Sequence, residues 1–239
     1  MYVPTLLACV CAVGASAIAP YGNSILERSA QTTSSIPQRQ DNSNPFDGKK
    51  LAINPDWAKK LEETHASFLA RSDTTNAQVV QAVRQVGSFA WISNIASLAS
   101  LDEIINSARA ERAATGVDQI IGLVLYNLPN RDCSSVQRPG ELRGIKGLGR
   151  YKDEYITPIA QKLSAATDLT FAVVVEPDAL ANMITNLSIE NCSKVVALYE
   201  EGIVFAISNL QFSHVHLYLD AAHGGWLGQA GNLGPGKER

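Results

Sequence analysis

The chain has 239 residues, of which 46% are hydrophobic, and its formal net charge is −3. This length can enclose one sizeable hydrophobic core. The chain is slightly acidic and has no basic run, so a nucleic-acid partner is not expected.

The first nineteen residues are apolar and uncharged, and small residues occupy positions 14–17. This pattern predicts a secretory signal peptide over residues 1–17, and therefore a secreted, extracellular protein. A membrane anchor is the alternative, although the run is short for a membrane span. Residues 18–43 are rich in Ser, Gln, Asn and Arg, which indicates a flexible linker or propeptide before a domain at 44–239.

From residue 44 onward, helical and strand patterns alternate. In chain order we expect helices at 56–70 and 76–86, a strand at 89–92, a helix at 101–114, a strand at 120–126, a helix at 155–166, a strand at 171–175, helices at 179–187 and 194–210, and a strand at 215–219. Such alternation predicts an α/β fold with a parallel sheet. About four βα units are present, half of the number in a closed barrel, so a partial barrel is expected. The segment 231–239 has no core-forming pattern.

Three residues refine these predicted helices. Gly116 is a candidate C-cap for the helix at 101–114. Pro158 is best placed in the first turn of the helix at 155–166. Trp57 lies on the first helix, where a packing role is expected.

Polar and aromatic residues follow all four predicted strands. They are Trp91 and Ser93 after the first strand, Tyr126, Arg131 and Asp132 at the second, Glu176 and Asp178 after the third, and Asp220, His223 and Trp226 after the fourth. The carboxyl ends of parallel strands lie on one side of a sheet, so these residues should converge. Carboxylates beside aromatic rings suggest a sugar site, because cleavage of a glycosidic bond needs a protonated acid at the leaving oxygen. Shielding or a neighbouring carboxylate can keep such an acid protonated.

Simpler interpretations exist for the same residues. Asp178 could cap the helix that follows it. Asp132 could pair with Arg131 in a solvated loop. Trp91 and Trp226 could belong to the core, where aromatic side chains are usually buried, and His223 could be a buried, hydrogen-bonded histidine.

Four cysteines divide into two pairs. Cys9 and Cys11 lie inside the predicted signal peptide, which leaves Cys133 and Cys192 in the mature chain. Two cysteines in a secreted chain favour one disulfide. Metal ligation is the alternative, but no cluster of His and Cys supports it, and no metal site is expected.

Three ordered motifs are similar to those of glycoside hydrolase family 6. They are Tyr-x-x-Pro-x-Arg-Asp-Cys at 126–133, Glu-Pro-Asp-Ala-Leu-Ala at 176–181 and Leu-Asp-Ala-Ala-His-Gly-Gly-Trp at 219–226. The resemblance extends over residues 44–228. It implies an inverting hydrolase of cellulose or another β-1,4-glucan, with a distorted, partly open α/β barrel. We expect no cofactor, no membrane partner and a monomeric protein.

The resemblance also implies roles for individual residues. Asp178 matches the proton donor, and Asp132 matches the aspartate that keeps the donor protonated and helps to order the water. Tyr126 matches the tyrosine next to the sugar at the point of cleavage. Residues expected to bind substrate are Trp91, Ser93, Asp220, His223 and Trp226. Cys133 and Cys192 match a family disulfide.

The sequence also departs from the family pattern. The aspartate proposed as catalytic base lies on later strands of the family, and it has no counterpart here. Ser93 stands where an aspartate is common, and Arg138 lies in a loop that usually holds small residues near the catalytic water. We therefore expect 44–239 to be the N-terminal portion of a catalytic domain. The alternatives are a half-barrel that binds glucan without turnover and an incomplete gene model of a longer cellobiohydrolase.

Overall fold

The structure is a computed structural model that describes residues 44–135 and 140–238. Internal contacts divide the chain into residues 1–42 and 43–239, and the described residues belong to the second unit. The predicted signal peptide, the whole predicted linker and Arg138 therefore lie outside the described residues.

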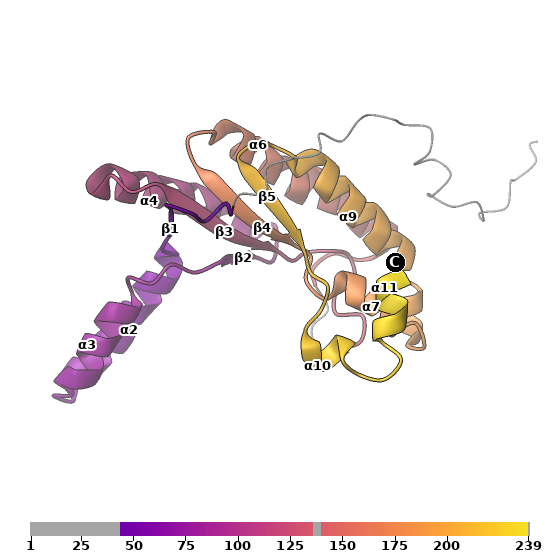
Figure 1. Ribbon diagram of the computed structural model, residues 1–239, viewed down its shortest axis with the longest axis horizontal. Coiled ribbons are helices and arrows are strands. Elements are labelled where there is room, and N and C mark those ends of the chain that lie inside the picture. Colours follow the sequence, from indigo (N-terminus) through magenta and orange to yellow (C-terminus); the bar gives the residue numbers. More distant parts are fainter. Residues whose placement is uncertain (1–43, 136–139, 239) are drawn as a thin grey trace, which may run out of the picture. The chain divides into compact units, whose positions relative to one another are not determined.

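A five-stranded parallel sheet forms the centre of this unit (Figure 1). Its strands are β1 (Lys50–Leu51), β2 (Ala90–Ile92), β3 (Gln119–Leu125), β4 (Thr170–Val175) and β5 (Val215–Leu219). The order is β1-β3-β4-β5, and β2 also pairs with β3. β1 pairs with the start of β3 through Lys50 and Gln119, and β2 pairs with its end through Ile92 and Leu125. The predicted parallel α/β architecture is confirmed, and β1 is an additional strand.

Helices connect the strands and cover the sheet. They are α2 (Pro55–Ala70), α3 (Thr74–Val83), η1 (Ala96–Leu98), α4 (Ala99–Thr115), α5 (Gly144–Arg150), η2 (Tyr151–Ile156), α6 (Thr157–Ala165), α7 (Ala179–Thr185), α8 (Glu190–Ser193), α9 (Val196–Leu210), α10 (Gly224–Leu227) and α11 (Leu233–Glu238). α4 ends at Gly116, which adopts a left-handed conformation with φ of 71° and donates its N–H to the carbonyl of Arg112, as predicted. None of the helices in the described part of the chain is long and apolar enough to cross a bilayer.

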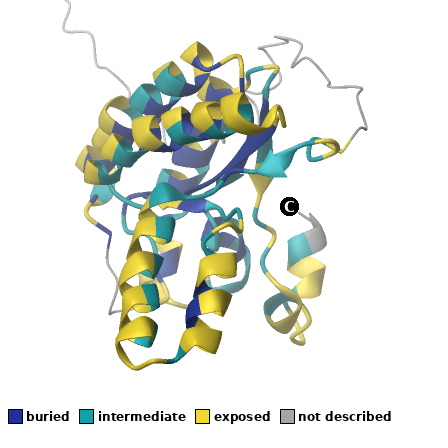
Figure 2. Cartoon of the chain, turned by 90° about the vertical axis from the view of Figure 1, so that its left-hand side faces the viewer, coloured by how far each residue is buried: buried dark blue, intermediate teal, exposed yellow. Residues whose placement is uncertain are grey.

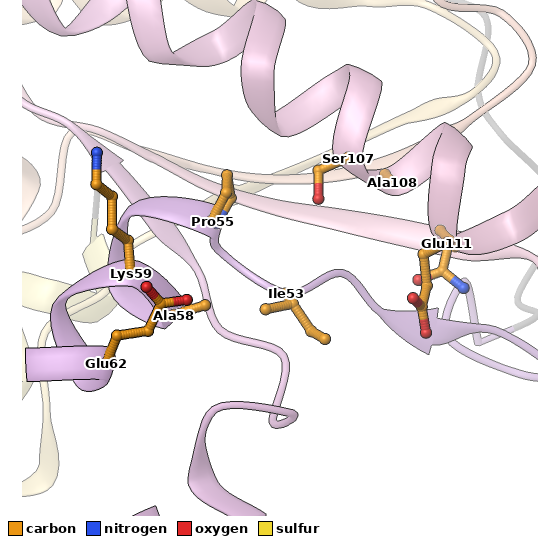
Figure 3. A pocket seen from close by; sticks show the side chains of 9 residues that line it. Ile53, Pro55, Ala58, Lys59, Glu62, Ser107, Ala108 and Glu111 are labelled. Atoms are coloured by element: carbon orange, nitrogen blue, oxygen red, sulfur yellow. The ribbon is translucent and has the colours of Figure 1, made fainter. Parts of the chain in front are cut away.

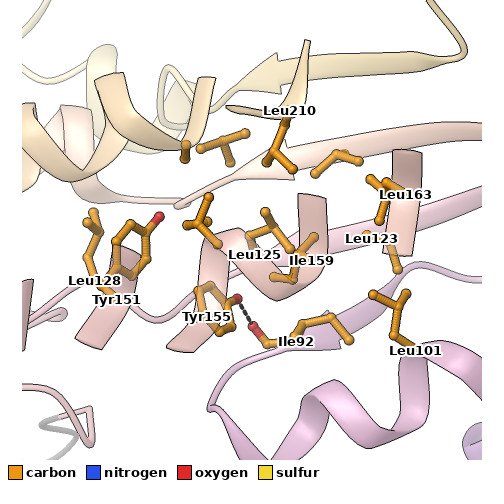
Figure 4. Packing of buried hydrophobic residues seen from close by; sticks show 14 of the residues in the cluster. Ile92, Leu101, Leu123, Leu125, Leu128, Tyr151, Tyr155, Ile159, Leu163 and Leu210 are labelled. Atoms are coloured by element: carbon orange, nitrogen blue, oxygen red, sulfur yellow. Dashed lines mark hydrogen bonds between the residues drawn. The ribbon is translucent and has the colours of Figure 1, made fainter. Parts of the chain in front are cut away.

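The main core lies between one face of the sheet and the helices α4, α6 and α9 (Figure 4). Alternate residues of the central strands, such as Leu123 and Val173, point into it, whereas Val124 and Val174 face the opposite side. Every residue of β3 is buried, as expected for a strand in the middle of a parallel sheet.

The α2–α3 hairpin contributes little to this core. No residue of α2 is buried, and Trp57 is 45% exposed, so Trp57 packs only in part and lies outside the core. Figure 2 shows the hairpin mostly in the colour of exposed residues, below the buried sheet. The two helices pack chiefly on each other, since α2 buries no residue and α3 buries only Ala77 and Val80.

Helical structure around Pro158 is longer than predicted. α5, η2 and α6 run on from Gly144 to Ala165, and η2 is a π-helix. Pro158 lacks the N–H that would bond to the carbonyl four residues earlier, and the helix widens before it, so that Thr157 donates to the carbonyl of Lys152. The glycine-rich start of this segment explains why no helix was predicted there.

The last segment also differs from expectation. α11 forms where no core-forming pattern is present, and it packs against α7. Leu233 is half exposed, which explains why hydropathy alone did not predict this short helix.

Candidate active site

Three acidic residues at the ends of β3 and β4 hold a left-handed backbone conformation. Their φ angles are 55° for Asp132, 48° for Glu176 and 65° for Asp178. This conformation is unfavourable for residues other than glycine, and it persists only where the surroundings hold it in place. Such strain is concentrated at functional sites, which supports the prediction that these strand ends form one.

Asp178 occupies the N-cap position of α7, but its side chain makes no capping hydrogen bond. The simple capping interpretation is therefore wrong. Its backbone N–H donates to Oδ2 of Asp220 at 2.8 Å, which links the ends of β4 and β5. The pKa of Asp178 is raised by partial burial and by the charges of Asp220 and Asp132, against an opposing effect of His223. A raised pKa suits a carboxyl group that must donate a proton.

Asp132 and Tyr126 are joined directly, since the Tyr126 hydroxyl donates to Oδ1 of Asp132. Burial, followed by this hydrogen bond and the charge of Asp132, raises the pKa of Tyr126, so the phenol stays protonated. The ring of Trp91 meets that of Tyr126 edge-on, with 5.6 Å between centroids. Trp91 is 56% exposed, which excludes the core interpretation for this residue.

Arg131 binds the backbone rather than Asp132. Its Nη1 donates to the carbonyl of Ser93 at 2.9 Å and to the carbonyl of Tyr126. Its Cζ lies 4.6 Å from the centroid of the Tyr126 ring. The alternative Arg131–Asp132 pair is absent from the ion pairs found in 44–135 and 140–238. Ser93 contributes its backbone carbonyl to this network.

His223 and Trp226 lie beyond the end of β5, with ring centroids 6.2 Å apart. His223 is exposed, so it is not a buried core histidine. Trp226 is partly buried and its Nε1 donates to Oγ1 of Thr185 on α7 at 2.8 Å. These two rings therefore form one wall next to the helix that begins after Asp178.

Cys133 and Cys192 form a disulfide with Cα atoms 4.9 Å apart, which confirms the prediction. Because Cys133 directly follows Asp132, the bond ties the Asp132 loop to α8. It joins residues 59 apart in sequence.

Glu176 lies beneath these residues and is only 2% exposed. Its carboxylate accepts hydrogen bonds from the N–H groups of Asn127 and Leu128 and from the Tyr151 hydroxyl. Burial raises the pKa of Glu176 to about 7, although these donors favour the ionised form. The sequence predicted Glu176 near the site without a definite role. The signal that could have indicated one is a carboxylate directly after a fully apolar strand.

A closed crevice and a cavity lie at opposite ends of β3. The crevice is too narrow to hold a water molecule and is lined by Tyr126, Arg131, Asp132, Glu176, Asp178 and Tyr199, so the structure brings together the predicted residues of two strand ends. The cavity has a volume of about 360 Å³ and lies between α2, α4 and the start of β3, beside Gln119 (Figure 3). The cavity is thus far from the paired aspartates along β3. In the described ranges, no group of three His, Cys, Asp or Glu side chains could hold a metal ion.

Residues 46–239 match the model of the family described as glycosyl hydrolases family 6. The chain belongs to this family. The expected resemblance is therefore confirmed over most of the chain, including all three strand-end motifs.

Several relatives in family 6 are similar over the same region. The 1,4-beta-D-glucan cellobiohydrolase CEL6B of Podospora anserina is 50% identical over 198 residues, which cover 82% of this chain and 47% of that protein. Endoglucanase-6B of Humicola insolens is 52% identical over 194 residues, covering 80% of this chain and 55% of the relative. The chain therefore spans about half the length of the curated relatives it matches.

A solved family 6 structure has the same fold. The endoglucanase CEL6B from Humicola insolens superposes with a TM-score of 0.78 at 50% identity, over 82% of this chain and 57% of that one. This similarity supports the partial barrel predicted from the strand and helix pattern.

Proposed function

We propose that this chain is a secreted, monomeric glucanase that hydrolyses the β-1,4-glucosidic bonds of cellulose with inversion. The observation that carries the proposal is the protonatable Asp178, placed beside Asp132 and Asp220 at the ends of parallel strands. Family membership and the names of the relatives, a cellobiohydrolase and an endoglucanase, agree with it. The disulfide agrees with an oxidising, extracellular location.

In this mechanism Asp178 gives its proton to the glycosidic oxygen as the bond to the anomeric carbon breaks. A water attacks that carbon from the opposite face, which inverts its configuration, and it releases one proton to the surrounding solvent as the new C–O bond forms. Asp132 keeps the donor protonated through its charge and helps to order the water. Tyr126 holds Asp132 in place through its hydroxyl.

Sugar binding is assigned to the aromatic residues around the aspartates. The exposed Trp91 ring beside Tyr126 offers a flat apolar surface on which a pyranose can stack. His223 and Trp226 provide a second such surface after β5, with Asp220 and Ser93 nearby in the strand-end segments.

The second candidate function is glucan binding without turnover. The exposed rings favour it, because stacking on Trp91 needs neither proton transfer nor an ordered water. In inverting enzymes a second carboxyl about 6.5–9.5 Å from the acid accepts the proton of the water, whereas binding alone needs no such group.

The experiment compares the full chain with Asp178→Asn and with Glu154→Gln, an exposed residue paired with Arg150 on the far side of η2. We expect the full chain to release reducing ends from a soluble cello-oligosaccharide. The rate of this release should fall at least about a thousandfold in Asp178→Asn. Glu154→Gln should match the wild type. Oligosaccharide binding without hydrolysis by the wild type would favour the second candidate.

A further inference from the structure

A buried carboxylate connects the ends of β3 and β4 underneath the candidate active site. The backbone N–H of Glu176 donates to the carbonyl of Leu125 at 2.8 Å, just beyond the last residue of β4. Its side chain then turns back toward β3. The N–H of Asn127 donates to both carboxylate oxygens, at 3.1 and 2.9 Å, and the N–H of Leu128 donates to Oε2 at 3.1 Å.

The π-helix η2 supports this connection from below. Tyr151 and Tyr155 are fully buried on η2, and the Tyr151 hydroxyl donates to Oε1 of Glu176 at 2.9 Å. The Tyr155 hydroxyl donates to the carbonyl of Ile92 and accepts from the N–H of Tyr126 at 3.1 Å. Figure 4 shows the hydrogen bond between Tyr155 and Ile92 of β2 as a dashed line. Two hydroxyls four residues apart thus hold the ends of β2, β3 and β4.

Glu176 is too deeply buried to contact a substrate. Glu176 is nevertheless connected to two residues that face the site. It precedes Asp178 by two residues, and the two backbone amides that it accepts from lie at the start of the segment that leads to Asp132. The groups that face its carboxylate are Tyr151 and Tyr155 from η2, together with Arg131, and Tyr199 of α9 lies within electrostatic range.

We propose that Glu176 is a positioning residue, which holds the Asn127–Asp132 segment in register with Asp178 so that the two aspartates face one substrate. This proposal rests on the proposed function for its catalytic consequence. The carboxylate suits the task because it can accept from three donors at once, whereas an amide offers only one acceptor oxygen. If the carboxylate were removed, the buried backbone amides of Asn127 and Leu128 would lose their acceptor, and the segment would move or admit water to satisfy them.

The test uses Glu176→Gln, with Glu154→Gln as the matched control on the exposed side of η2. Hydrogen exchange of the Asn127 and Leu128 amides is compared by NMR with that of Leu123 in β3, and kcat and KM are measured on a soluble cello-oligosaccharide. We expect the two loop amides of Glu176→Gln to exchange at least about tenfold faster relative to Leu123. We expect kcat to fall at least about tenfold, with KM changed less than about threefold.

A merely structural role would accelerate exchange at Leu123 as much as at the loop amides, and that result would overturn the proposal. Wild-type exchange and wild-type kcat in Glu176→Gln would also overturn it. A wild-type chain that does not hydrolyse the oligosaccharide would contradict the proposed function alone, because the exchange comparison needs no turnover.

Tyr151→Phe provides a second variant should Glu176→Gln fail to fold. It removes one donor and keeps the ring and the carboxylate. The Tyr151 hydrogen bond lowers the pKa of Glu176, so the ¹³C resonance of the Glu176 carboxyl should titrate at higher pH in this variant. An unchanged titration midpoint together with an unchanged kcat would overturn the proposal.

Discussion

At the scale of single residues, the chemistry of the site depends on carboxyl groups in different surroundings. Asp178 is partly buried between two other carboxylates and has a raised pKa. Asp132 instead accepts a hydrogen bond from the Tyr126 hydroxyl. A carboxyl group whose pKa is raised in this way suits the role of a proton donor.

Asp220→Asn should move the pH dependence of hydrolysis. Removing the charge of Asp220 lowers the pKa of Asp178, while the amide oxygen can still accept the Asp178 N–H. The alkaline limb of kcat/KM, which reports the acid in the free protein, should therefore shift to lower pH. The measurement is a pH profile of kcat/KM for both proteins. An unchanged or higher alkaline limb would contradict this assignment of the acid.

Glu176 should make folding stability depend on pH. Its pKa is raised from 4.5 to about 7 in the folded protein, so the folded state binds the proton more tightly than the unfolded state. This contribution is complete below pH 4.5 and is lost as the pH rises through 7. Relative to Glu176→Gln, the wild type should lose about 3 kcal/mol of unfolding free energy across that window. Urea denaturation at several pH values checks it, and parallel pH curves would contradict it.

At the scale of elements, burial is unequal across the fold. β3 is buried throughout and pairs with β1, β2 and β4, whereas α2 buries no residue. The α2–α3 hairpin begins with a side-chain cap from Asn54 and depends mostly on its own contacts. Elements with few buried contacts open locally at low free energy.

Hydrogen exchange should therefore be faster in the hairpin than in the sheet. We expect the amides of α2 to exchange at least about a hundredfold faster than those of β3 and β4, with α9 closer to the strands because it is anchored in the core. Mass spectrometry of peptides from the two regions measures this. Equal protection of α2 and β3 from exchange would contradict the prediction that the hairpin opens locally at low free energy.

The disulfide gives the Asp132 loop an anchor independent of the sheet. Replacing both Cys133 and Cys192 by Ser should lower the unfolding free energy by about 4 kcal/mol, according to the loop-entropy relation for a separation of 59 residues. Urea denaturation of the oxidised wild type and the double variant provides the comparison. A difference under about 1 kcal/mol would mean that the bond restrains the unfolded chain little.

At the scale of the whole molecule, hydrophobic patterning predicted the parallel α/β sheet, because β3 and β4 are apolar runs between helical segments. It did not predict β1, since two residues show no periodicity, or η2, which depends on Pro158 and its neighbours. The family motifs predicted Asp178 and Asp132 as site residues. The hydrogen bonds from three donor groups to Glu176 and the backbone contacts of Arg131 could not be predicted, because they depend on how separate loops fold together.

The most direct test of the proposed function is the stereochemistry of hydrolysis. Proton NMR of a soluble cello-oligosaccharide with the full chain should show the α-anomer of the product first, because water attacks opposite the leaving group that Asp178 protonates. The same spectrum with Asp178→Asn should show no product. A β-anomer formed first, or equal turnover by the variant, would contradict the assignment of Asp178 as the acid of an inverting glucanase.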